Sequence, residues 1–512
     1  MGINPVNRFF WGVIVLALCL NFSILSHDFY YHDDFRFWEG QVGNESLEGI
    51  AVYYLALGRP FLSWWMRLAE KIFFLRWQLW PVRLLVIGMV IISAIFFKKL
   101  WRHPKYAVIP EPIRMATALG IIILPSFYSA SIWIICSAVP LATLLALAGN
   151  FFFDARPLKQ PRHINEFLCV VMVCMSYVTY QTAASVFLVP YIILALYRLR
   201  AECSFRSLGF LIKPTVLFVG ASILYLVIHK LIVFLTFLMP RGAEQFAFST
   251  DPVAKIQSLL GTMTPMAMNF IPGYGREFLM LAVLLMLLVA WGSYVQQRQN
   301  NTVAFMPRYI VMGSVLVFIY MAFLNCVNLA AVEGTIMHRT VSSMQLLFFG
   351  LFMMGLYYLP LSKKVNCYLM LFFILLITWG GTRVVVRTVL SWHRQLEAMQ
   401  QVFDGYLERT GAFPKNMHVY MIQKDPPRGN EVMPFTLYAW YEEPRAWGNR
   451  VMSRYMKHNS RHWVYDGTEK YKDYSRPARA LVKITYSFSS RPFNKGQDTL
   501  IVDLPGMCHK NF

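Results

Sequence analysis

Charged residues are scarce in this sequence of 512 amino acids: Asp, Glu, Lys and Arg make up 15% of it, while 57% is hydrophobic. Soluble globular proteins carry about 25% charged residues, so the composition excludes an ordinary soluble protein. Hydrophobic stretches of about 17–25 residues, each long enough to cross a bilayer, recur from end to end. The scarcity of charge therefore predicts an α-helical protein that crosses the membrane many times.

Cysteine patterns typical of metal or disulfide chemistry are missing too. The eight Cys are scattered, and no two of them form a CxxC pair. Several lie inside apolar segments, as Cys136 and Cys169 do. The spacing indicates neither a zinc site nor a disulfide framework, so we expect no metal ion and no cofactor.

No compact basic module with interleaved aromatic residues stands out either, although the formal net charge is +21. Many Lys and Arg instead flank apolar segments, where they act as topology signals, so we expect no nucleic-acid partner. The first apolar segment, residues 9–26, has no cleavage site of small residues. We therefore expect a retained helix rather than a signal peptide that is removed.

Eleven apolar segments predict membrane-spanning helices. They lie near residues 9–26, 80–97, 113–128, 133–153, 165–181, 183–199, 212–235, 277–296, 309–328, 342–359 and 366–386. An odd number of spans places the two termini on opposite sides of the membrane. The short segments on one side collect seventeen Lys and Arg, which predicts that this side, with the N-terminus, is cytoplasmic.

Acidic residues follow the opposite pattern. Most Asp and Glu before residue 385 fall in three loops on the other side, at 27–79, 236–276 and 329–341. These loops belong to the predicted membrane module, residues 1–386. Any catalytic chemistry is therefore expected outside the cytoplasm, where neither ATP nor a sugar nucleotide is available.

The C-terminal tail, residues 387–512, predicts a separate extracytoplasmic domain. A helix-like segment at 397–411 precedes two strand-like segments at 417–422 and 499–504, which favours a small mixed α/β fold. The tail holds nineteen Lys and Arg against twelve Asp and Glu, together with four Trp. Because such a surface suits a sugar polymer or an anionic lipid surface, we expect the tail to bind the acceptor without supplying a catalytic residue.

The stretch YYHDDFRFWEG, residues 30–40, places two adjacent carboxylates just after the first apolar segment. Asp33 and Asp34 can cap or turn the chain, which is the common role of an Asp in a loop. Together with Arg36 and the flanking aromatic rings, they also form surroundings that can tune a carboxylate for proton abstraction. Adjacent side chains of an extended segment point to opposite faces, so only one of the two can point into a pocket, with Asp33 slightly favoured, while the other caps the chain or pairs with Arg36. A divalent cation is not indicated, because no third and fourth oxygen ligand stands nearby.

Three motifs, in their order and position, resemble those of the GT-C membrane glycosyltransferases. They are the acidic pair, the GRPF segment at 58–61 within the surface helices expected over 46–75, and SYVTYQTA, which begins at residue 176. Within that class the chain is most similar to the serotype-converting O-antigen glucosyltransferases of bacteria and their phages. The resemblance covers the membrane portion, about residues 1–385, and does not clearly extend to the tail.

The resemblance implies a donor sugar, with glucose favoured, that is attached to a polyprenyl phosphate. A single inverting displacement moves the sugar to an O-antigen, a lipopolysaccharide or a related cell-surface glycan on the periplasmic side of the bacterial inner membrane. A companion flippase and a donor synthase are further implied partners, alongside the membrane lipids.

The implied site combines acids, cations and a pocket. Asp33 or Asp34 deprotonates the acceptor hydroxyl, and Glu39 is an auxiliary acid. The charge that develops on the leaving phosphate needs Arg near the outer surface, and each such Arg can instead be an anchor at the headgroups. The candidates for the phosphate contact are Arg59, Arg276 and Arg339. The pocket candidates are Tyr31, Arg36, Trp64, Tyr180, Gln181 and Tyr274.

Two other functions stay open at the level of sequence. An O-antigen polymerase or ligase is also polytopic and has large external loops, but the tail would be unexplained. A transporter of a lipid-linked sugar usually has internal repeats and charged or broken helices near the bilayer midplane. The sequence shows no repeat and almost no charge at these positions, so the glycosyltransferase ranks first.

We predict that Asp33→Asn, Asp34→Asn or both remove transferase activity, while expression and membrane insertion stay normal because the amide keeps the size of the side chain. Loss of a general base lowers a rate by about 10²–10⁴-fold. Transfer of labelled sugar to acceptor glycan in membranes of each mutant measures the effect. Full activity in both single mutants and in the double mutant would contradict the catalytic role of the pair.

Overall fold

The computed structural model describes a set of segments spread over the whole chain. They are residues 5–20, 22–26, 55, 59–76, 80–132, 137–155, 161–202, 205–236, 251–271, 306–325, 338–410, 418–422 and 499–503. The chain divides into two compact units. One comprises Met1–Phe22 and Ala51–Val384, and the other comprises Ser23–Ile50 and Val385–Phe512.

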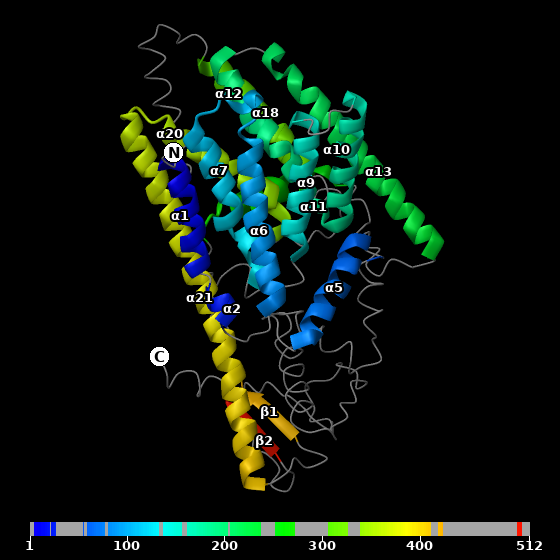
Figure 1. Cartoon of the computed structure of the whole chain (residues 1–512), viewed down its shortest axis with the longest axis vertical. Coiled ribbons are helices and arrows are strands. Elements are labelled where there is room, and N and C mark those ends of the chain that lie inside the picture. Colours follow the sequence, from blue (N-terminus) through cyan, green and yellow to red (C-terminus); the bar gives the residue numbers. More distant parts are fainter. Residues whose placement is uncertain are drawn as a thin grey trace. The chain divides into compact units, whose positions relative to one another are not determined.

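Helices make up the described part of the first unit (Figure 1). The longer ones are α1 (Pro5–Leu20), α5 (Pro60–Arg76), α6 (Trp80–Leu100), α7 (Glu111–Ile123), α9 (Ala138–Ala155), α10 (Arg162–Thr179), α12 (Val189–Glu202), α13 (Ile212–Thr236), α18 (Met306–Leu324) and α20 (Ser342–Tyr357). The shorter ones are η2 (Pro104–Tyr106), α8 (Pro125–Ile132), α11 (Gln181–Ala184), η4 (Ser185–Leu188), η5 (Phe205–Leu211), α15 (Pro252–Ser258), η6 (Leu259–Met263), α16 (Thr264–Met268) and η8 (His338–Val341). Two helices cross the boundary between the units, α2 (Phe22–Ser26) and α21 (Lys363–Thr410).

Seven helices in the described residues are long and apolar enough to cross a membrane. They are Arg8–Ser26, Trp80–Leu100, Glu111–Ser131, Ala138–Ala155, Gln181–Leu199, Leu208–Ile232 and Lys363–Val386. Two shorter apolar helices, Val311–Leu324 and Ser342–Tyr357, accompany them. The chain is therefore a helical membrane protein, as its composition predicts.

The predicted spans coincide with helices, within a few residues, wherever the structure describes them. α10 corresponds to the predicted span 165–181, but its first turn carries Arg162, His163 and Glu166, which makes it less apolar than the seven. The predicted span 277–296 lies outside the described residues. The total of eleven spans and the orientation of the termini therefore stay predictions.

α21 is one uninterrupted helix of 48 residues. The predicted span 366–386 and the predicted helix 397–411 are parts of it, so the expectation of two separate helices is wrong. No Gly or Pro stands between the two segments, and nothing in the local sequence stops a helix there. 

Two short strands follow α21 in the second unit. β1 (His418–Ile422) and β2 (Thr499–Asp503) pair in parallel, with His418 opposite Thr499 and Ile422 opposite Asp503. They lie within the predicted strands 417–422 and 499–504. Most of the tail lies outside the described residues, so its mixed α/β fold stays a prediction.

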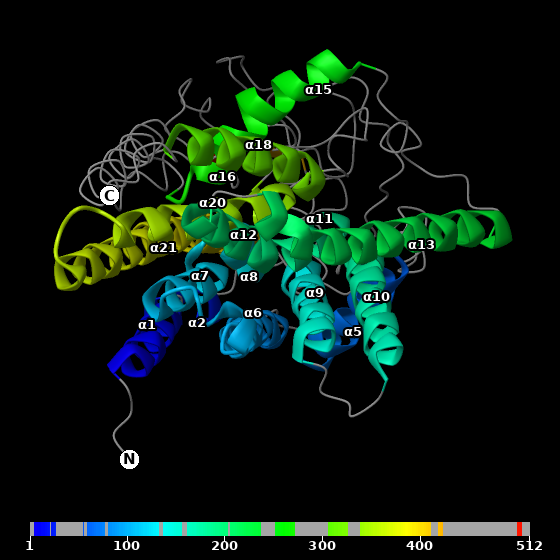
Figure 2. The same ribbon diagram turned by 90° about the horizontal axis from the view of Figure 1, so that it is seen from above.

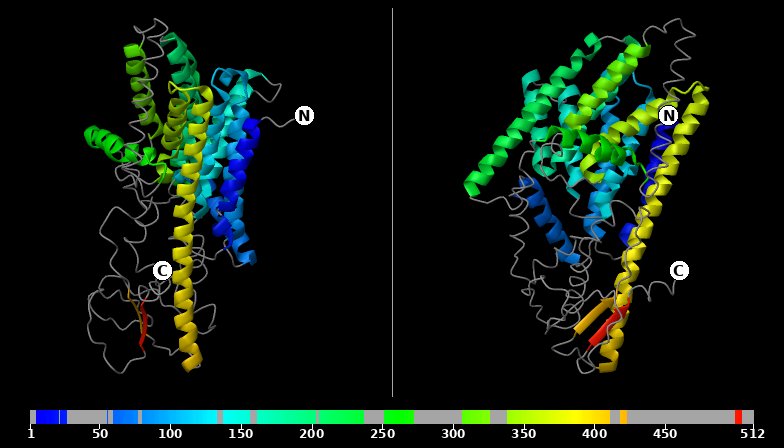
Figure 3. Two further views of the ribbon diagram at one scale, coloured as in Figure 1. Left: turned by 90° about the vertical axis from the view of Figure 1, so that its left-hand side faces the viewer. Right: turned by 180° about the vertical axis from the view of Figure 1, so that it is seen from behind.

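Helices α7 and α9 organise the packing of the first unit. α9 packs along α10 and α6, and α13 packs against α10 (Figure 2). α7 packs against α6, α1 and α20, and α20 also contacts α12 (Figure 3). The surface helix α5 packs against α6 and α10, which places the segment that follows GRPF against the bundle.

The close approach of α9 and α10 depends on Gly149. A Cβ atom at this position would lie 2.8 Å from Cγ2 of Val173 and 3.3 Å from the carbonyl oxygen of Cys169, both on α10. Nearby, Oγ of Ser176 donates a hydrogen bond to the carbonyl of Ala142 at 2.6 Å. Small residues allow membrane helices to approach this closely, so α9 and α10 form a rigid pair.

We predict that Gly149→Ala lowers the unfolding temperature of the detergent-solubilised protein, because overpacking of a tight contact costs about 1–3 kcal/mol. Gly88→Ala is the matched control, since no atom lies within 4 Å of a Cβ at that position. The control should keep the wild-type unfolding temperature or raise it slightly. Equal shifts in the two variants would contradict the proposed contact.

Candidate functional site

Arg59 lies just before α5 and reaches the junction between α10 and α11. Its Nε donates a hydrogen bond to Oε1 of Gln181 at 2.6 Å. Its guanidinium carbon lies 4.9 Å from the centre of the Tyr180 ring, a distance at which a cation is attracted to an aromatic face. Arg59 is 122 residues from Gln181 in sequence. The structure thus brings together three of the predicted site residues.

This junction exists because the helix stops at Tyr180. The residue has extended backbone angles, φ −155° and ψ 104°, between the end of α10 and the start of α11. Its N–H still donates to the carbonyl of Ser176 at 2.8 Å, and its own carbonyl accepts from the N–H of Ala183 at 3.1 Å. The break predicted at Tyr180–Thr182 is confirmed, and both Tyr180 and Gln181 are buried.

Both the oxygen and the nitrogen of the Gln181 amide form hydrogen bonds. While Oε1 accepts from Arg59, Nε2 donates to the hydroxyl of Tyr225 on α13 at 2.9 Å. The Tyr225 ring stacks on Tyr177, with centroids 5.4 Å apart and an angle of 18° between the planes. The Tyr225 ring also stacks on His229, with centroids 6.1 Å apart and an angle of 9° between the planes. The hydroxyl that holds Gln181 therefore belongs to a stacked ring.

The helix α5 is fixed next to this junction. Nε1 of Trp65 donates to Oγ of Ser137, just before α9, at 2.7 Å, and Leu62 and Met66 are buried with it. Trp64, a predicted pocket residue, is instead 54% exposed and stacks on Phe61 with centroids 5.3 Å apart. One side of α5 thus anchors Arg59, while the other presents an aromatic pair.

Two further predicted segments approach the same region. The turn η8, which contains Arg339, packs against α8 and α11; the side chain of Arg339 lies outside the described residues. Nε2 of Gln345 on α20 donates to the carbonyl of Asn269 at 2.9 Å. Asn269 begins the segment NFIPGYGREF. The remaining predicted site residues, Tyr31, Asp33, Asp34, Arg36, Glu39, Tyr274 and Arg276, lie outside the described residues, and their roles stay predictions.

Sequence reasoning missed Tyr225 and Arg83. Tyr225 is a polar side chain in an apolar helix, and only the tertiary structure shows that it meets Gln181. Arg83 lies one turn inside the span Trp80–Leu100, and its side chain is almost completely buried. A charged residue inside a membrane span is a functional candidate by default, and this signal was present in the sequence.

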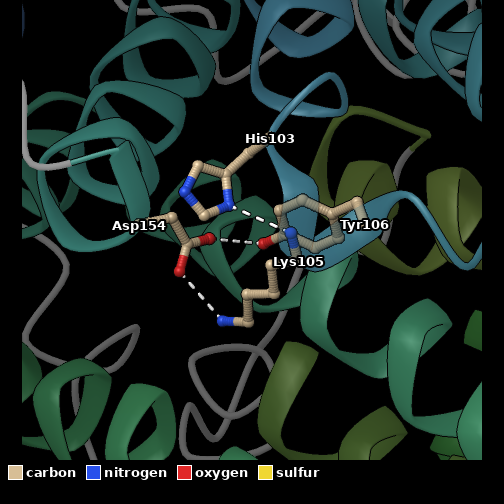
Figure 4. A network of polar contacts seen from close by, with 4 residues as sticks. All are labelled: His103, Lys105, Tyr106 and Asp154. Atoms are coloured by element: carbon tan, nitrogen blue, oxygen red, sulfur yellow. Dashed lines mark hydrogen bonds and ion pairs between the residues drawn. The ribbon is translucent and has the colours of Figure 1, made fainter.

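A second polar cluster lies near the opposite end of α9 (Figure 4). Nζ of Lys105 pairs with Oδ1 of Asp154 at 2.9 Å, and the hydroxyl of Tyr106 donates to Oδ2 at 2.5 Å. The N–H of Lys105 donates to Nδ1 of His103 at 3.3 Å. Asp154 is near the C-terminal end of α9, whose 18 residues span about 27 Å at the usual helical rise. The two clusters are therefore separated by roughly the thickness of a bilayer core.

The cluster around Asp154 has the character of a structural contact. Nζ of Lys105 also lies 4.3 Å from the centre of the Tyr191 ring, so the ammonium is enclosed by an aromatic ring and a carboxylate. Burial lowers the pKa of Lys105, and the Asp154 carboxylate opposes this effect. Burial, followed by the charge of Asp154, raises the pKa of the Tyr106 phenol. The Asp154 carboxylate thus holds an ammonium at one oxygen and a phenol hydroxyl at the other.

Several cations at this end of the bundle pair with carboxylates. Glu166 accepts from Nε of Arg162 at 2.6 Å and also pairs with Lys213. No ion pair of the described residues includes Arg59; its contacts there are a neutral amide and an aromatic ring. Within the described part of the chain its positive charge is oriented and meets no carboxylate, which is the setting of an anion-binding residue.

No protein-family model matches this chain, and no curated protein matches it. Within the described residues, no group of three or more His, Cys, Asp or Glu side chains is arranged to hold a metal ion. Function is therefore inferred from the chemistry of the residues.

We predict that Asp154→Asn lowers the free energy of unfolding by about 2–3 kcal/mol, because it leaves a partly buried ammonium without its counter-charge. Glu166→Gln is the control, since Arg162 of that pair is exposed and such pairs contribute under about 1 kcal/mol. Denaturation of the purified protein in detergent measures both. Equal losses in the two variants would show that burial of the Asp154 pair has no special energetic role.

Proposed function

We propose that this protein is an inverting glycosyltransferase that uses a polyprenyl-phosphate-linked sugar as its donor. Glucose is the first candidate for the sugar, and the acceptor is an O-antigen, a lipopolysaccharide or a related cell-surface glycan. The observation that carries the proposal is the setting of Arg59, whose guanidinium is oriented by Gln181 and Tyr180 without a neutralising carboxylate in the described part of the chain.

Arg59 suits a phosphate in both charge and shape. Its Nε is engaged by Gln181, while its two Nη groups make no hydrogen bond to any residue that the structure describes. These groups form a planar pair of donors that matches two phosphate oxygens. Because water is partly excluded by the buried neighbours, the charge acts on an anion more strongly than it would in solution.

The surroundings of Arg59 also favour a lipid-linked ligand. Phe61 and Trp64 follow Arg59 in the first turns of α5 and form a stacked, partly exposed pair. Such a surface can bind a polyprenyl chain or the face of a sugar ring. A polyprenyl-phosphate sugar combines both parts, a phosphate at the headgroup level and an apolar chain beside it.

The distribution of basic residues supports a periplasmic position for the site. The end of the bundle with Lys105 and Lys213 carries many of the short basic segments, and such segments face the cytoplasm. The end with Arg59 would then face the periplasm of a bacterial inner membrane. We include in the proposal a cytoplasmic N-terminus, eleven spans, and a periplasmic domain over residues 387–512 that binds the acceptor.

The reaction is one displacement at the anomeric carbon. Asp33 or Asp34 takes the proton of the acceptor hydroxyl, whose oxygen attacks C1 of the sugar from the face opposite the phosphate. The bond between C1 and the phosphate oxygen breaks, its electron pair stays on the polyprenyl phosphate, and the configuration at C1 inverts. Arg59 stabilises the charge that grows on the leaving phosphate, with Arg276 and Arg339 as further candidates.

We predict that Arg59→Gln lowers kcat/KM for the donor by about 10²–10³-fold, the range seen when one donor to a developing oxyanion is removed. Arg67→Gln is the matched control, because Arg67 is exposed on α5, the helix that follows Arg59, and the variant should keep near wild-type activity. The assay uses the purified protein in proteoliposomes with radiolabelled polyprenyl-phosphate glucose and lipopolysaccharide, and it contains no nucleotide sugar.

Three outcomes would contradict the proposal. Transfer that requires a nucleotide sugar would exclude a lipid donor. Movement of the labelled lipid across the bilayer without transfer to the acceptor would indicate a transporter. Lengthening of the glycan by whole repeat units would indicate a polymerase.

A further inference from the structure

The buried hydroxyl of Tyr225 stands out among the polar groups of the first unit. It lies in the apolar helix α13, yet it accepts a hydrogen bond from Nε2 of Gln181, whose Oε1 accepts from Arg59. Three side chains from three separate segments thus form one line of hydrogen bonds. At its outer end is the cation that the proposed function assigns to the donor phosphate.

Gln181 needs a second contact to orient Arg59. A glutamine side chain has three rotatable bonds, and fixing such a side chain costs up to about 2 kcal/mol of rotamer entropy. The hydrogen bond to Arg59 alone would let the amide swing with the guanidinium. Because Tyr225 holds Nε2 at 2.9 Å, both ends of the amide are fixed, and the direction of Oε1 is fixed with them.

Tyr225 is itself held by its neighbours rather than by its own helix alone. Its ring stacks on Tyr177 of α10, and the hydroxyl of Tyr177 accepts from Oγ of Ser222, one turn before Tyr225, at 2.8 Å. His229, one turn after Tyr225, stacks beside the ring. The stack links α10 and α13, so the hydroxyl cannot move independently of the two helices.

The neutrality of the Gln181 amide matters as much as its position. A glutamate in its place would orient Nε of Arg59 equally well, and it would also neutralise the guanidinium. Lys105, near the opposite end of the bundle, has a carboxylate partner of this kind in Asp154. A neutral amide orients Arg59 and leaves its whole charge available to a phosphate.

We propose that Gln181 and Tyr225 are positioning residues, which fix the guanidinium of Arg59 so that its Nη groups meet a phosphate monoester or diester of a lipid. This inference rests on the proposed function, because it assigns the role of Arg59 to the donor phosphate. Neither residue touches the reacting atoms; both act through Arg59.

The test measures binding of farnesyl phosphate, a short polyprenyl phosphate, to the purified full-length protein in detergent by titration calorimetry. Farnesol, which lacks the phosphate, is the reference ligand. Tyr225→Phe keeps the ring stack and removes one hydroxyl. We expect it to weaken farnesyl phosphate binding about five- to tenfold, the usual effect of one lost hydrogen bond, and to leave farnesol binding unchanged.

Tyr320→Phe is the matched control. The hydroxyl of Tyr320 on α18 shares a hydrogen bond of 2.7 Å with Oγ1 of Thr215, near the start of α13, so the variant also removes one tyrosine hydroxyl that bonds between two helices, without a contact to Gln181 or Arg59. It should bind farnesyl phosphate as the wild type does. Equal effects of Tyr225→Phe and Tyr320→Phe would overturn the inference while leaving the proposed function intact.

If Tyr225 acts through Arg59, the effects of substituting the two residues should not add. In an Arg59→Gln background, Tyr225→Phe should have no further effect, since residues that act as one unit are not additive. A full additional loss in that background would mean that Tyr225 acts independently, and the inference would be wrong. Gln181→Glu should weaken phosphate binding at least as much as Tyr225→Phe does, and unchanged binding in that variant would also overturn the inference.

The same titrations separate this inference from the proposed function. If the wild type bound farnesyl phosphate no better than farnesol, there would be no phosphate site at Arg59, and both proposals would fall. If the wild type preferred farnesyl phosphate and Arg59→Gln lost that preference, the phosphate site would stand. The comparison of Tyr225→Phe with Tyr320→Phe would then decide the role of Tyr225 alone.

Discussion

A buried amide between two membrane helices must find hydrogen-bond partners, because leaving one unpaired costs about 1–3 kcal/mol even in soluble proteins. Gln181 meets this demand with Arg59 on one side and Tyr225 on the other. Its position follows from the break at Tyr180, which ends α10 and begins α11. The same break therefore divides one stretch of sequence into two helices and ties the segment before α5 to the bundle.

Cations of the bundle have two kinds of partner. At one end Lys105 and Lys213 pair with carboxylates, so these contacts lower the energy of the folded chain and leave little charge for a ligand. At the other end Arg59 is held by an amide and a ring. Under the proposed function, the donor phosphate supplies the negative charge that this guanidinium does not meet within the described residues.

The packing of the bundle gives this contact its rigidity. Gly149 lets α9 and α10 approach closely, and Trp65 ties α5 to the start of α9 through Ser137. α10 in turn ends at the junction that holds Arg59, and its Tyr177 stacks on Tyr225. Orientation of a single guanidinium thus depends on contacts among four segments, which is the kind of support that a preorganised binding site requires.

The sequence by itself determined the membrane class, the positions of most helices and the break at Tyr180–Thr182, because these depend on local hydropathy and on polar interruptions within a span. It also marked Arg59, Tyr180 and Gln181 as separate candidates. It was wrong about a separation within residues 363–410, where the absence of a helix-breaking residue outweighed the change in polarity. The count of eleven spans, the acid pair and the α/β tail stay predictions.

Only the tertiary structure decided that these three residues meet and that Tyr225 joins them. A hydrogen bond across 122 residues depends on how α5, α10 and α13 pack, and packing reflects the shapes of many side chains at once rather than any local pattern. In the apolar sequence of α13, nothing indicates that Tyr225 contacts Gln181. Whether a polar group in a membrane span is structural or functional is decided by its partners, and partners are a property of the folded chain.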